Sequence, residues 1–226
     1  MTMTQAAPTN FTLDFDRERR QGVPEIVYGP GKTDAEIATI VQLLHDTNSG
    51  PILVTRVAPS TADTVMAAVN GGTYDQRARV LTWRSAPPKK NFTLGVVTAG
   101  TADGPVADEA IAVATAIGLP VVDIRDVGVA GLHRLIARIE DITHLDAVIV
   151  VAGMEGALAS VLGGLVAAPV ICVPTSTGYG AALEGVTALL AMMTASVAGL
   201  TVVNIDSGFG AAMAAHRLSL RRPTSL

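Results

Sequence analysis

The second half of the chain alternates short apolar runs with Ala- and Gly-rich segments of helical length. The apolar runs after residue 91 read TLGVVTA, PVVDI, DAVIVVA, PVICVP and LTVVNI. Between them the sequence predicts helices over residues 105–118, 130–140, 155–167 and 179–198. Because strands that alternate with helices form right-handed βαβ units, this pattern predicts an α/β fold, a three-layer α/β/α domain around a parallel sheet.

The first half predicts a smaller α/β domain. Thr33 is a favourable N-cap, and Ile37, Ile40, Val41 and Leu44 follow it at helical spacing. Strands PILVT and RVLTW flank a second helix that begins at Pro59 and ends near residue 69. The sequence therefore divides into a flexible N-terminus (1–13), a small N-terminal α/β domain (14–91), the α/β/α domain (92–215) and a C-terminal tail (216–226).

Composition excludes several classes of protein. With 49% hydrophobic and 16% charged residues, little of the chain is expected to be disordered. A net charge of -4 leaves no basic surplus for a nucleic-acid backbone, and 4% aromatic residues argue against a base-stacking RNA platform. A single cysteine excludes an internal disulfide framework and a Cys-rich zinc site.

One stretch raises the question of a membrane span. Residues 181–203 carry Glu184 as their one charge, and a spanning helix needs about 20 apolar residues. The stretch lies between two predicted strands and contains small polar residues, which favours a packed helix of a buried sheet. We expect the excess apolar surface to lie at subunit interfaces of a homo-oligomer. The N-terminus shows no secretory signal, so we expect a cytoplasmic protein with no membrane partner.

The predicted strands end in loops of similar composition. In an open parallel sheet these carboxyl ends share one edge, where ligands bind. The loops are rich in Gly, Thr, Ser and Asp, which let backbone N–H groups approach an anion. The sequence therefore predicts a phosphate-bearing ligand, although GxGxxG and GxxxxGK[ST] are both absent. The loops span residues 98–103, 125–128, 152–156, 174–180 and 204–210.

Longer motifs resemble a known family. The run AGMEGALASVLGGLVAAPVICVPTSTGYGAALEG, with VTAGTAD before it and NIDSGFGA after it, resembles the aminoimidazole ribonucleotide (AIR) carboxylase superfamily. The segments DRERRQGVPEIVYGPGKT and DVGVAGLHR, with Thr55-Arg56, are similar to the LarB family of nickel-pincer cofactor biosynthesis. The resemblance extends from about residue 14 to about residue 215.

The resemblance implies a reaction on nicotinic acid adenine dinucleotide. The family adds CO2, supplied as CO2 or bicarbonate, to carbon 5 of the pyridinium ring and hydrolyses the phosphoanhydride to release AMP. The product is pyridinium-3,5-biscarboxylic acid mononucleotide. A cysteine thiolate adds to the ring and makes carbon 5 nucleophilic, which is covalent catalysis. The resemblance also implies Mg2+ at the phosphoanhydride and a homo-octamer.

This chain departs from the family at the nucleophile. Where the family has a segment like AMLNSCASG, the chain reads AMMTASVAG, which puts Ser196 at the cysteine position. A hydroxyl stays protonated at neutral pH, whereas a thiol is partly ionised. Three explanations are a deliberate Cys-to-Ser substitution, a natural paralogue with altered chemistry, and replacement by Cys172. The third is the weakest, because a cysteine inside the apolar strand PVICVP is typical of an inert core.

The resemblance also implies roles for other side chains. Glu155, in AGMEGA, matches a motif glutamate that acts in acid/base chemistry or binds Mg2+, although a glutamate in a first helical turn also stabilises the helix. Asp103, in GTAD, matches a turn that contacts phosphate, ribose or metal-bound water, or else it only forms the turn. His133 is a proton carrier, a carboxylate anchor or a structural residue. We expect His45, His144 and His216 at the surface.

Binding residues are expected in the loops and in the N-terminal domain. Arginine suits a pyrophosphate and a carboxylate, although the DRERR run also fits a solvated cluster or salt bridges between subunits. Two alternative functions stay open: an AIR carboxylase-like enzyme for another nucleotide, and a nucleotide-binding protein without carboxylase activity. The expected binding residues are Gly100, Thr101, Ala102, Gly153, Ser176, Gly178, Tyr179 and Gly180, with the cations Arg17, Arg20, Lys32 and Arg56.

Overall fold

The structure is a computed structural model that describes residues 10–221. The expected flexible N-terminus falls mostly on residues 1–9, which lie outside the described residues, while Phe11 and Leu13 pack against the N-terminal core. The predicted tail from residue 216 is wrong at its start, because helix α8 (Gly208–Ser219) continues through it. Residues 222–226 lie outside the described part.

The N-terminal domain is a four-stranded sheet in the order β1-β2-β4-β3. Strand β1 pairs parallel with β2, and the other pairs are antiparallel. Helix α2 begins as predicted, because the Thr33 side chain accepts from Glu36 N at 3.2 Å and the Glu36 carboxylate accepts from Thr33 N at 2.8 Å. The elements are α1 (Arg17–Gln21), β1 (Val27–Tyr28), α2 (Asp34–Thr47), β2 (Ile52–Thr55), α3 (Pro59–Ala68), β3 (Thr73–Asp75) and β4 (Val80–Trp83).

The C-terminal domain confirms the predicted parallel α/β fold. Its five strands follow the order β6-β5-β7-β8-β9, and every neighbouring pair is parallel. The strands are β5 (Leu94–Thr98), β6 (Val121–Ile124), β7 (Ala147–Ala152), β8 (Val170–Pro174) and β9 (Leu200–Val202). The α-helices are α4 (Gly104–Ala116), α5 (Leu132–Ile136), α6 (Ala157–Leu165), α7 (Val186–Met193) and α8.

Two predicted helices are shorter than expected. The helix predicted over 130–140 is reduced to α5 between two 3-10 turns. The helix predicted over 179–198 is a 3-10 segment over Gly180–Gly185 followed by α7. Leu183 and Glu184 have left-handed φ values of 47° and 52°, and Gly185 lies against the backbone of Thr175, so tertiary packing overrides the helix propensity. Within residues 10–221, none of the helices combines the length and the apolar character that a bilayer-spanning helix requires.

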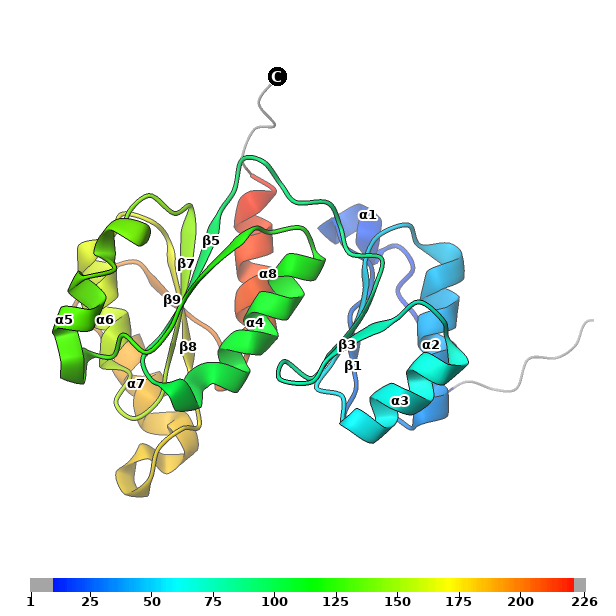
Figure 1. Cartoon of the computed structure of the whole chain (residues 1–226), viewed down its shortest axis with the longest axis horizontal. Helices are drawn as coiled ribbons and strands as arrows, with labels where there is room; N and C mark the ends of the chain where they lie inside the picture. Colours follow the sequence, from blue (N-terminus) through cyan, green and yellow to red (C-terminus); the bar gives the residue numbers. More distant parts are fainter. Residues whose placement is uncertain (1–9, 222–226) are drawn as a thin grey trace, which may run out of the picture.

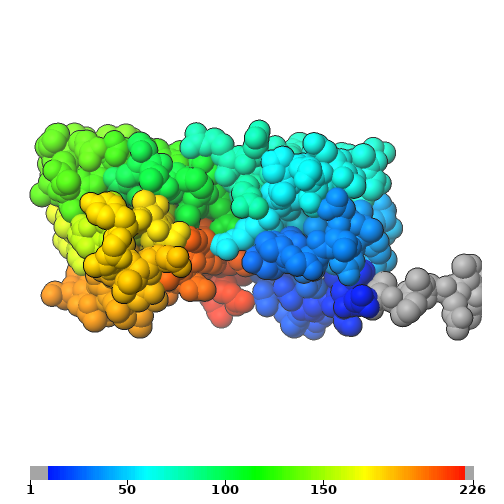
Figure 2. Space-filling model, turned by 90° about the horizontal axis from the view of Figure 1, so that it is seen from below, coloured from blue at the N-terminus to red at the C-terminus, as the bar shows by residue number. Residues whose placement is uncertain are grey.

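Helices α4 and α8 form a layer between the two sheets (Figure 1). In β2, Ile52 and Val54 belong to the core with α2 and α3, whereas Leu53 belongs to the core with α4 and α8. Successive side chains of a strand point to opposite faces of the sheet, so β2 contributes to one core on each face. Helices α5, α6 and α7 cover the outer face of the second sheet (Figure 1). The space-filling view shows the N-terminal half, blue to cyan, directly beside the C-terminal half (Figure 2).

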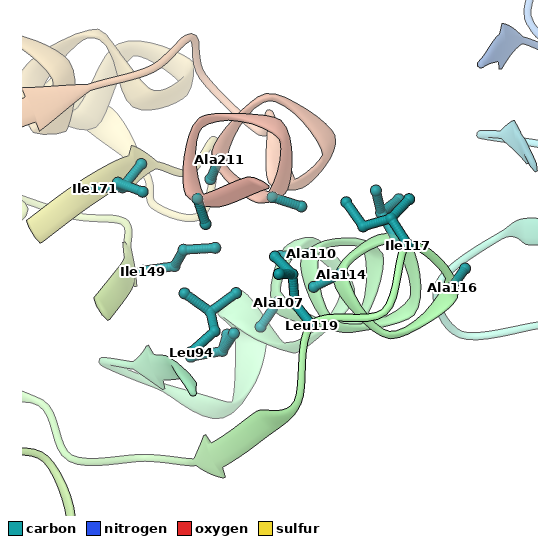
Figure 3. Close-up of a cluster of buried hydrophobic side chains, with 14 of the residues drawn as sticks. Leu94, Ala107, Ala110, Ala114, Ala116, Ile117, Leu119, Ile149, Ile171 and Ala211 are labelled. Carbon is teal, nitrogen blue, oxygen red and sulfur yellow. The ribbon is translucent and has the colours of Figure 1, made fainter. Parts of the chain in front are cut away.

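Small side chains allow α4 and α8 to pack closely. Ala107, Ala110 and Ala114 of α4 lie in the same core as Ala211 of α8 (Figure 3). A Cβ atom on Gly208 would lie 2.3 Å from the Val106 carbonyl oxygen, so glycine is required at this contact. The Ala-rich composition of the chain thus serves a close helix–helix contact above the sheet.

His216 joins the two domains at the far end of α8. It was expected at the surface, but it is 2% exposed, and this prediction is wrong. Its Nε2 lies 2.9 Å from the carbonyl oxygen of Gln21, which therefore accepts a hydrogen bond, while Nδ1 has no partner among the described residues. Burial lowers the pKa of His216 below its ordinary value of 6.5. The imidazole is therefore held in its neutral form.

This arrangement predicts a stability that depends on pH through His216. Because the unfolded chain binds the proton more readily, the contribution of neutral His216 is complete above about pH 6.5 and is lost as the pH falls through its lowered folded pKa. We expect His216→Gln to flatten the decline in the free energy of unfolding between about pH 7.5 and about pH 5, measured by urea denaturation. His45→Gln, at an exposed histidine, should leave the decline unchanged. Equal pH profiles for wild type and His216→Gln would contradict the assignment.

Candidate active site

The carboxyl edge of the parallel sheet is shaped by residues in left-handed conformations. Asp126, Met154 and Asp206 follow β6, β7 and β9, with φ values of 57°, 53° and 56°. Residues other than glycine rarely adopt such conformations, and they keep them only where surrounding hydrogen bonds hold the backbone. The Thr98 hydroxyl accepts from Asp126 N at 3.0 Å, and the Thr177 carbonyl accepts from Met154 N at 2.9 Å. The loops of this edge are thus held together by hydrogen bonds between neighbouring strands.

An open cavity of about 400 Å³ lies among the loops that follow β5, β6 and β7. We call it the edge cavity. It brings together six of the site residues predicted from the sequence. It also contains Asp126 and Thr177, which lie in two of the predicted loops but were not named as site residues, and Arg134, which was not predicted. The predicted residues that line it are Gly100, Thr101, Ala102, Asp103, Gly153 and Glu155.

Asp103 is the buried carboxyl group of the edge cavity. It is 2% exposed, and it accepts hydrogen bonds from Thr175 Oγ1 at 2.7 Å and from Gly100 N at 2.8 Å. Burial raises the pKa of Asp103 above its usual range, although hydrogen bonds from Thr175, Gly100 and Gly153 act in the opposite direction. A carboxyl group with a raised pKa is suited to take up and release a proton.

Glu155 lies at the mouth of the same cavity. It is exposed and occupies the turn between β7 and α6. The sequence predicted that helix α6 begins at residue 155. The helix begins at Ala157, because Gly156 is the N-cap with a left-handed φ of 66°. Glu155 therefore precedes the helix, and its side chain is available to a ligand.

Gly153 allows two loops to approach each other. A Cβ atom there would lie 2.3 Å from the Thr177 carbonyl oxygen and 2.6 Å from Thr175 Oγ1. No side chain fits at these distances, so the glycine is required for the cavity's shape rather than for its flexibility. Because Thr175 donates to Asp103, the same contact also positions the buried carboxyl group.

Arg134 supplies the cation of the edge cavity. Its Nη1 donates to Asp126 Oδ2 at 2.6 Å, and its side chain is partly exposed. His133, the residue predicted from the motif, is exposed and does not line the edge cavity. The motif AGLHR contained both residues, and only the placement of the short helix α5 distinguishes them. An arginine at this point is suited to bind a phosphate or carboxylate group.

The loop after β8 forms a separate hollow. Ser176, Gly178, Tyr179 and Gly180 line an open space of about 420 Å³ together with Leu183 and Glu184 of the 3-10 segment. Tyr179 is 81% exposed, so the structure does not bring it against Asp103 or Glu155. The Ser176 backbone N–H donates to Asp206 Oδ1 at 2.8 Å, which connects this loop to the one after β9.

Of the four predicted cations, Arg56 alone lines a cavity at this edge, one that lies between the domains. Arg17 pairs with Asp14 at 3.1 Å, and Arg20 pairs with Asp14 and with Asp16. Of the alternatives for the DRERR run, a solvated charge cluster describes Arg17 and Arg20, and their ion pairs lie within one subunit. Helix α1, which carries them, ends beside the C-terminal end of α8, so it lies toward the opposite edge of the sheet.

Lys32 does not line the edge cavity or the cavity that contains Arg56. Its ammonium group donates to the carbonyl oxygen of Tyr28 at 2.9 Å. This bond joins the loop between β1 and α2 to the last residue of β1. The loop follows the same end of the N-terminal sheet as Arg56, because Tyr28 pairs with Thr55 and Gly29 N donates to the Thr55 carbonyl oxygen at 3.0 Å.

Ser196 lies at the other edge of the sheet. It is exposed in the segment between α7 and β9, just before the amino end of β9. Glu155 follows the carboxyl end of β7, a strand of six residues that spans about 20 Å. One subunit therefore does not bring Ser196 and Glu155 together.

Cys172 is unsuited to replace the family's nucleophile. It is fully buried in β8, between Val150 of β7 and Val202 of β9. Burial raises the pKa of the Cys172 thiol to about 12. The thiol therefore stays protonated and out of reach of a ligand, as the sequence predicted for a core cysteine.

The carboxylates of the described residues do not form a complete metal site. Within residues 10–221, no group of three or more His, Cys, Asp or Glu side chains is placed to hold a metal ion. The edge cavity is lined by the carboxylates of Asp103, Asp126 and Glu155, and because Asp126 is bonded to Arg134, the other two are left for a cation. This matches the usual mode for Mg2+, which takes one or two protein carboxylates and completes its shell with substrate phosphates and water.

Comparisons with known proteins confirm the family resemblance found in the motifs. The model of the LarB/PurE-like N-terminal domain matches residues 8–85, and the AIR carboxylase model matches residues 93–224. An uncharacterised protein of Methanocaldococcus jannaschii, MJ0165, is 41% identical over 208 residues, which cover 88% of this chain and 80% of that protein. The similarity thus includes both domains.

The contact at Gly153 predicts a specific loss of stability. We expect Gly153→Ala to lower the free energy of unfolding by about 1–3 kcal/mol, because the added methyl group meets backbone atoms of the loop after β8. Gly164→Ala, in α6 with open space around it, is the matched control and should raise the free energy of unfolding by about 0.5–1 kcal/mol. Urea denaturation measures both. Equal stability of Gly153→Ala and wild type would show that the two loops do not touch.

Proposed function

We propose, because the chain belongs to the AIR carboxylase family and carries a LarB/PurE-like N-terminal domain, that it acts on nicotinic acid adenine dinucleotide. The family makes it a carboxylase-type enzyme. In the proposed reaction CO2 bonds to carbon 5 of the pyridinium ring, the carbon 5 proton leaves, and water cleaves the phosphoanhydride to release AMP. The observation that carries the proposal is the presence of both domains in one chain, since the N-terminal domain is the part that resembles the LarB family.

The edge cavity is the proposed site of the pyridine nucleotide. Arg134, bonded to Asp126, offers guanidinium N–H groups to the phosphate or to the nicotinate carboxylate. Asp103, whose pKa burial raises, is suited to accept the proton that leaves carbon 5. Glu155 at the mouth would hold Mg2+ beside the phosphates, and Asp103 would contact that ion only through a metal-bound water. Mg2+ bound there would neutralise charge on the phosphoanhydride and assist its hydrolysis.

Ser196 enters this proposal from a second copy of the chain. Within one subunit it lies at the edge of the sheet opposite Glu155, so it reaches the edge cavity only across a subunit interface. Helix α7, directly before Ser196, leaves Leu190 56% and Met193 67% exposed on the outer layer. Apolar side chains on an uncovered helical layer are typical of an interface. We therefore propose a homo-oligomer, an octamer as in the family, in which this layer is covered.

The residue at the nucleophile position favours a second candidate function. Ser196 carries a hydroxyl group where the family has a thiol, and the one cysteine of the chain is buried with a pKa of about 12. A protein that binds the dinucleotide, or hydrolyses it, without carboxylating it would retain the edge cavity and lack the covalent step.

Restoring the thiol tests the reaction. We expect Ser196→Cys to raise the rate of carboxylation of nicotinic acid adenine dinucleotide at least about a hundredfold, because a thiolate adds to the pyridinium ring far more readily than a hydroxyl group. The assay contains bicarbonate and Mg2+ and follows the gain of one carboxyl group and the loss of AMP by mass. Ser60→Cys, at an exposed serine of α3, controls for the added thiol.

The outcomes separate the two candidate functions. Carboxylation by Ser196→Cys alone supports the family reaction with a missing nucleophile. AMP release without carboxylation in every variant supports a hydrolase. Equal carboxylation by the Ser and Cys forms would show that the thiol is not required. Absence of any reaction or binding with pyridine dinucleotides would exclude both functions.

The uncovered helical layer predicts an assembly. Static light scattering at micromolar concentrations should give the mass of a homo-oligomer, and Leu190→Asp should reduce that mass because the charge falls within the proposed interface. Leu43→Asp, at an exposed leucine of α2, is the matched control and should leave the mass unchanged. A wild-type monomer would contradict the proposed assembly.

A further inference from the structure

Arg134 is the one cationic side chain among the described residues that line the edge cavity. The same lining carries the carboxylates of Asp103, Asp126 and Glu155. The position of a single guanidinium group therefore decides whether an anionic part of a ligand meets a positive charge or a carboxylate. Two residues that do not line the cavity determine this position.

Gly131 leaves the space in which the guanidinium group of Arg134 lies. A Cβ atom on Gly131 would lie 2.6 Å from Arg134 Nε and 3.2 Å from both Cζ and Nη2. Gly131 is the N-cap of α5, so the Arg134 side chain turns back toward the start of its helix and passes over this residue. Because no methyl group fits at 2.6 Å, a larger residue at position 131 displaces the guanidinium group.

The Arg134 side chain, and not the backbone, requires glycine at position 131. The φ of Gly131 is -123°, outside the left-handed region that favours glycine. At Gly128 and Gly153, by contrast, an added Cβ atom would lie 2.6 Å and 2.3 Å from backbone carbonyl oxygens. Those two glycines allow loops to pack against each other, whereas Gly131 allows one side chain to reach its position.

Thr98 fixes the carboxylate that accepts from Arg134. It is fully buried at the end of β5, where its hydroxyl oxygen accepts from Asp126 N at 3.0 Å and its carbonyl oxygen accepts from Val127 N at 3.0 Å. These bonds hold Asp126 at its left-handed φ of 57°. Asp126 Oδ2 in turn accepts from Arg134 Nη1 at 2.6 Å. Thr98 therefore acts on Arg134 through Asp126.

Arg134 keeps donors open to a ligand. A guanidinium group carries several N–H donors, and the bond to Asp126 is the one hydrogen bond of the Arg134 side chain within residues 10–221. The side chain is 38% exposed. A guanidinium group that is held on one side and open on the other binds carboxylate or phosphate oxygens with little further loss of side-chain entropy.

We propose that Gly131 and Thr98 are positioning residues for Arg134, and that together they hold its guanidinium group where an anionic group of the ligand binds. This proposal rests on the proposed function, in which the edge cavity binds the pyridine nucleotide. Gly131 provides the space, and Thr98 provides the fixed acceptor through Asp126. The site is thus ordered before the ligand arrives, which lowers the cost of binding.

Gly131→Ala tests the role of the space. Calorimetric titration of the full-length protein with nicotinic acid mononucleotide should show an affinity about tenfold to a hundredfold below that of the wild type, because a charge-assisted hydrogen bond is lost. The fold should be retained, since the methyl group meets a flexible side chain. Gly164→Ala, with open space around it, is the matched control and should bind as the wild type does. Equal affinity of Gly131→Ala and wild type would overturn the role of Gly131.

Two substitutions at Thr98 test the role of the acceptor. Thr98→Val replaces the hydroxyl group by a methyl group and should weaken binding of the same nucleotide by about tenfold, whereas Thr98→Ser keeps the hydroxyl group and should restore most of the affinity. A merely structural role would give the opposite order, because valine fills the buried position better than serine. Wild-type affinity in Thr98→Val, or a greater loss in Thr98→Ser, would overturn the role of Thr98.

Double substitutions separate positioning from a direct effect on the ligand. In an Arg134→Ala background, neither Gly131→Ala nor Thr98→Val should weaken binding further, because both act through the missing guanidinium group. Additive losses would overturn the proposal. A loss that nicotinamide mononucleotide shares would assign Arg134 to the phosphate, and a loss confined to the acid would assign it to the carboxylate; either result supports the positioning roles.

Urea denaturation keeps this proposal distinct from the proposed function. If the wild type binds no pyridine nucleotide, the proposed function fails, and the denaturation midpoints decide the proposal. Gly131→Ala should lower the midpoint more in the wild type than in Arg134→Ala, since the added methyl group meets the guanidinium group only where arginine is present. Equal shifts in the two backgrounds would show that Gly131 does not hold the place of Arg134.

Discussion

Helix α4 is buried on two sides, and the arrangement of the whole chain depends on it. One side contacts the parallel sheet together with α8, and the other contacts the sheet of the N-terminal domain. Its alanines permit these close contacts. Its first turns also carry the carboxylates Asp108 and Glu109, which fix the arginines between the domains, and Asp103 immediately precedes it. The same helix thus forms the core and orients the candidate site.

Much of this fold follows from local patterns in the sequence. Continuous apolar runs predicted every strand of the parallel sheet, and Thr33 and Pro59 marked the starts of α2 and α3. Helix α8 was not predicted, and the segment over 179–198 was predicted as one helix, because Ala and Leu favour a helix whatever contacts they make. The break at Leu183 and Glu184 depends on the packing of Gly185 against Thr175 in the loop after β8, and the burial of His216 depends on its contact with Gln21, far away in the sequence.

The candidate site was predictable where it depends on strand ends. Parallel strands bring their carboxyl-end loops to one edge, so Asp103, Gly153 and Glu155 meet as expected. The choice between His133 and Arg134 depends on the orientation of a five-residue helix, which no periodicity in so short a segment reveals. Ser196 matches a motif, but a motif match carries no information about the edge of the sheet at which a residue lies. The position of Ser196 became visible only in the folded chain.

The layer of α4 and α8, which both sheets contact, limits how the N-terminal domain can be gained or lost. Val23, Leu53 and Val80 of the N-terminal domain share one hydrophobic core with α4 and α8, and no separate apolar surface closes either domain there. Removing the N-terminal domain would expose this side of α4 to water, at about 25 cal/mol for each Å² of apolar surface. The domain is therefore not an interchangeable module. A carboxylase domain that gains or loses it must also replace the outward side chains of α4 and α8.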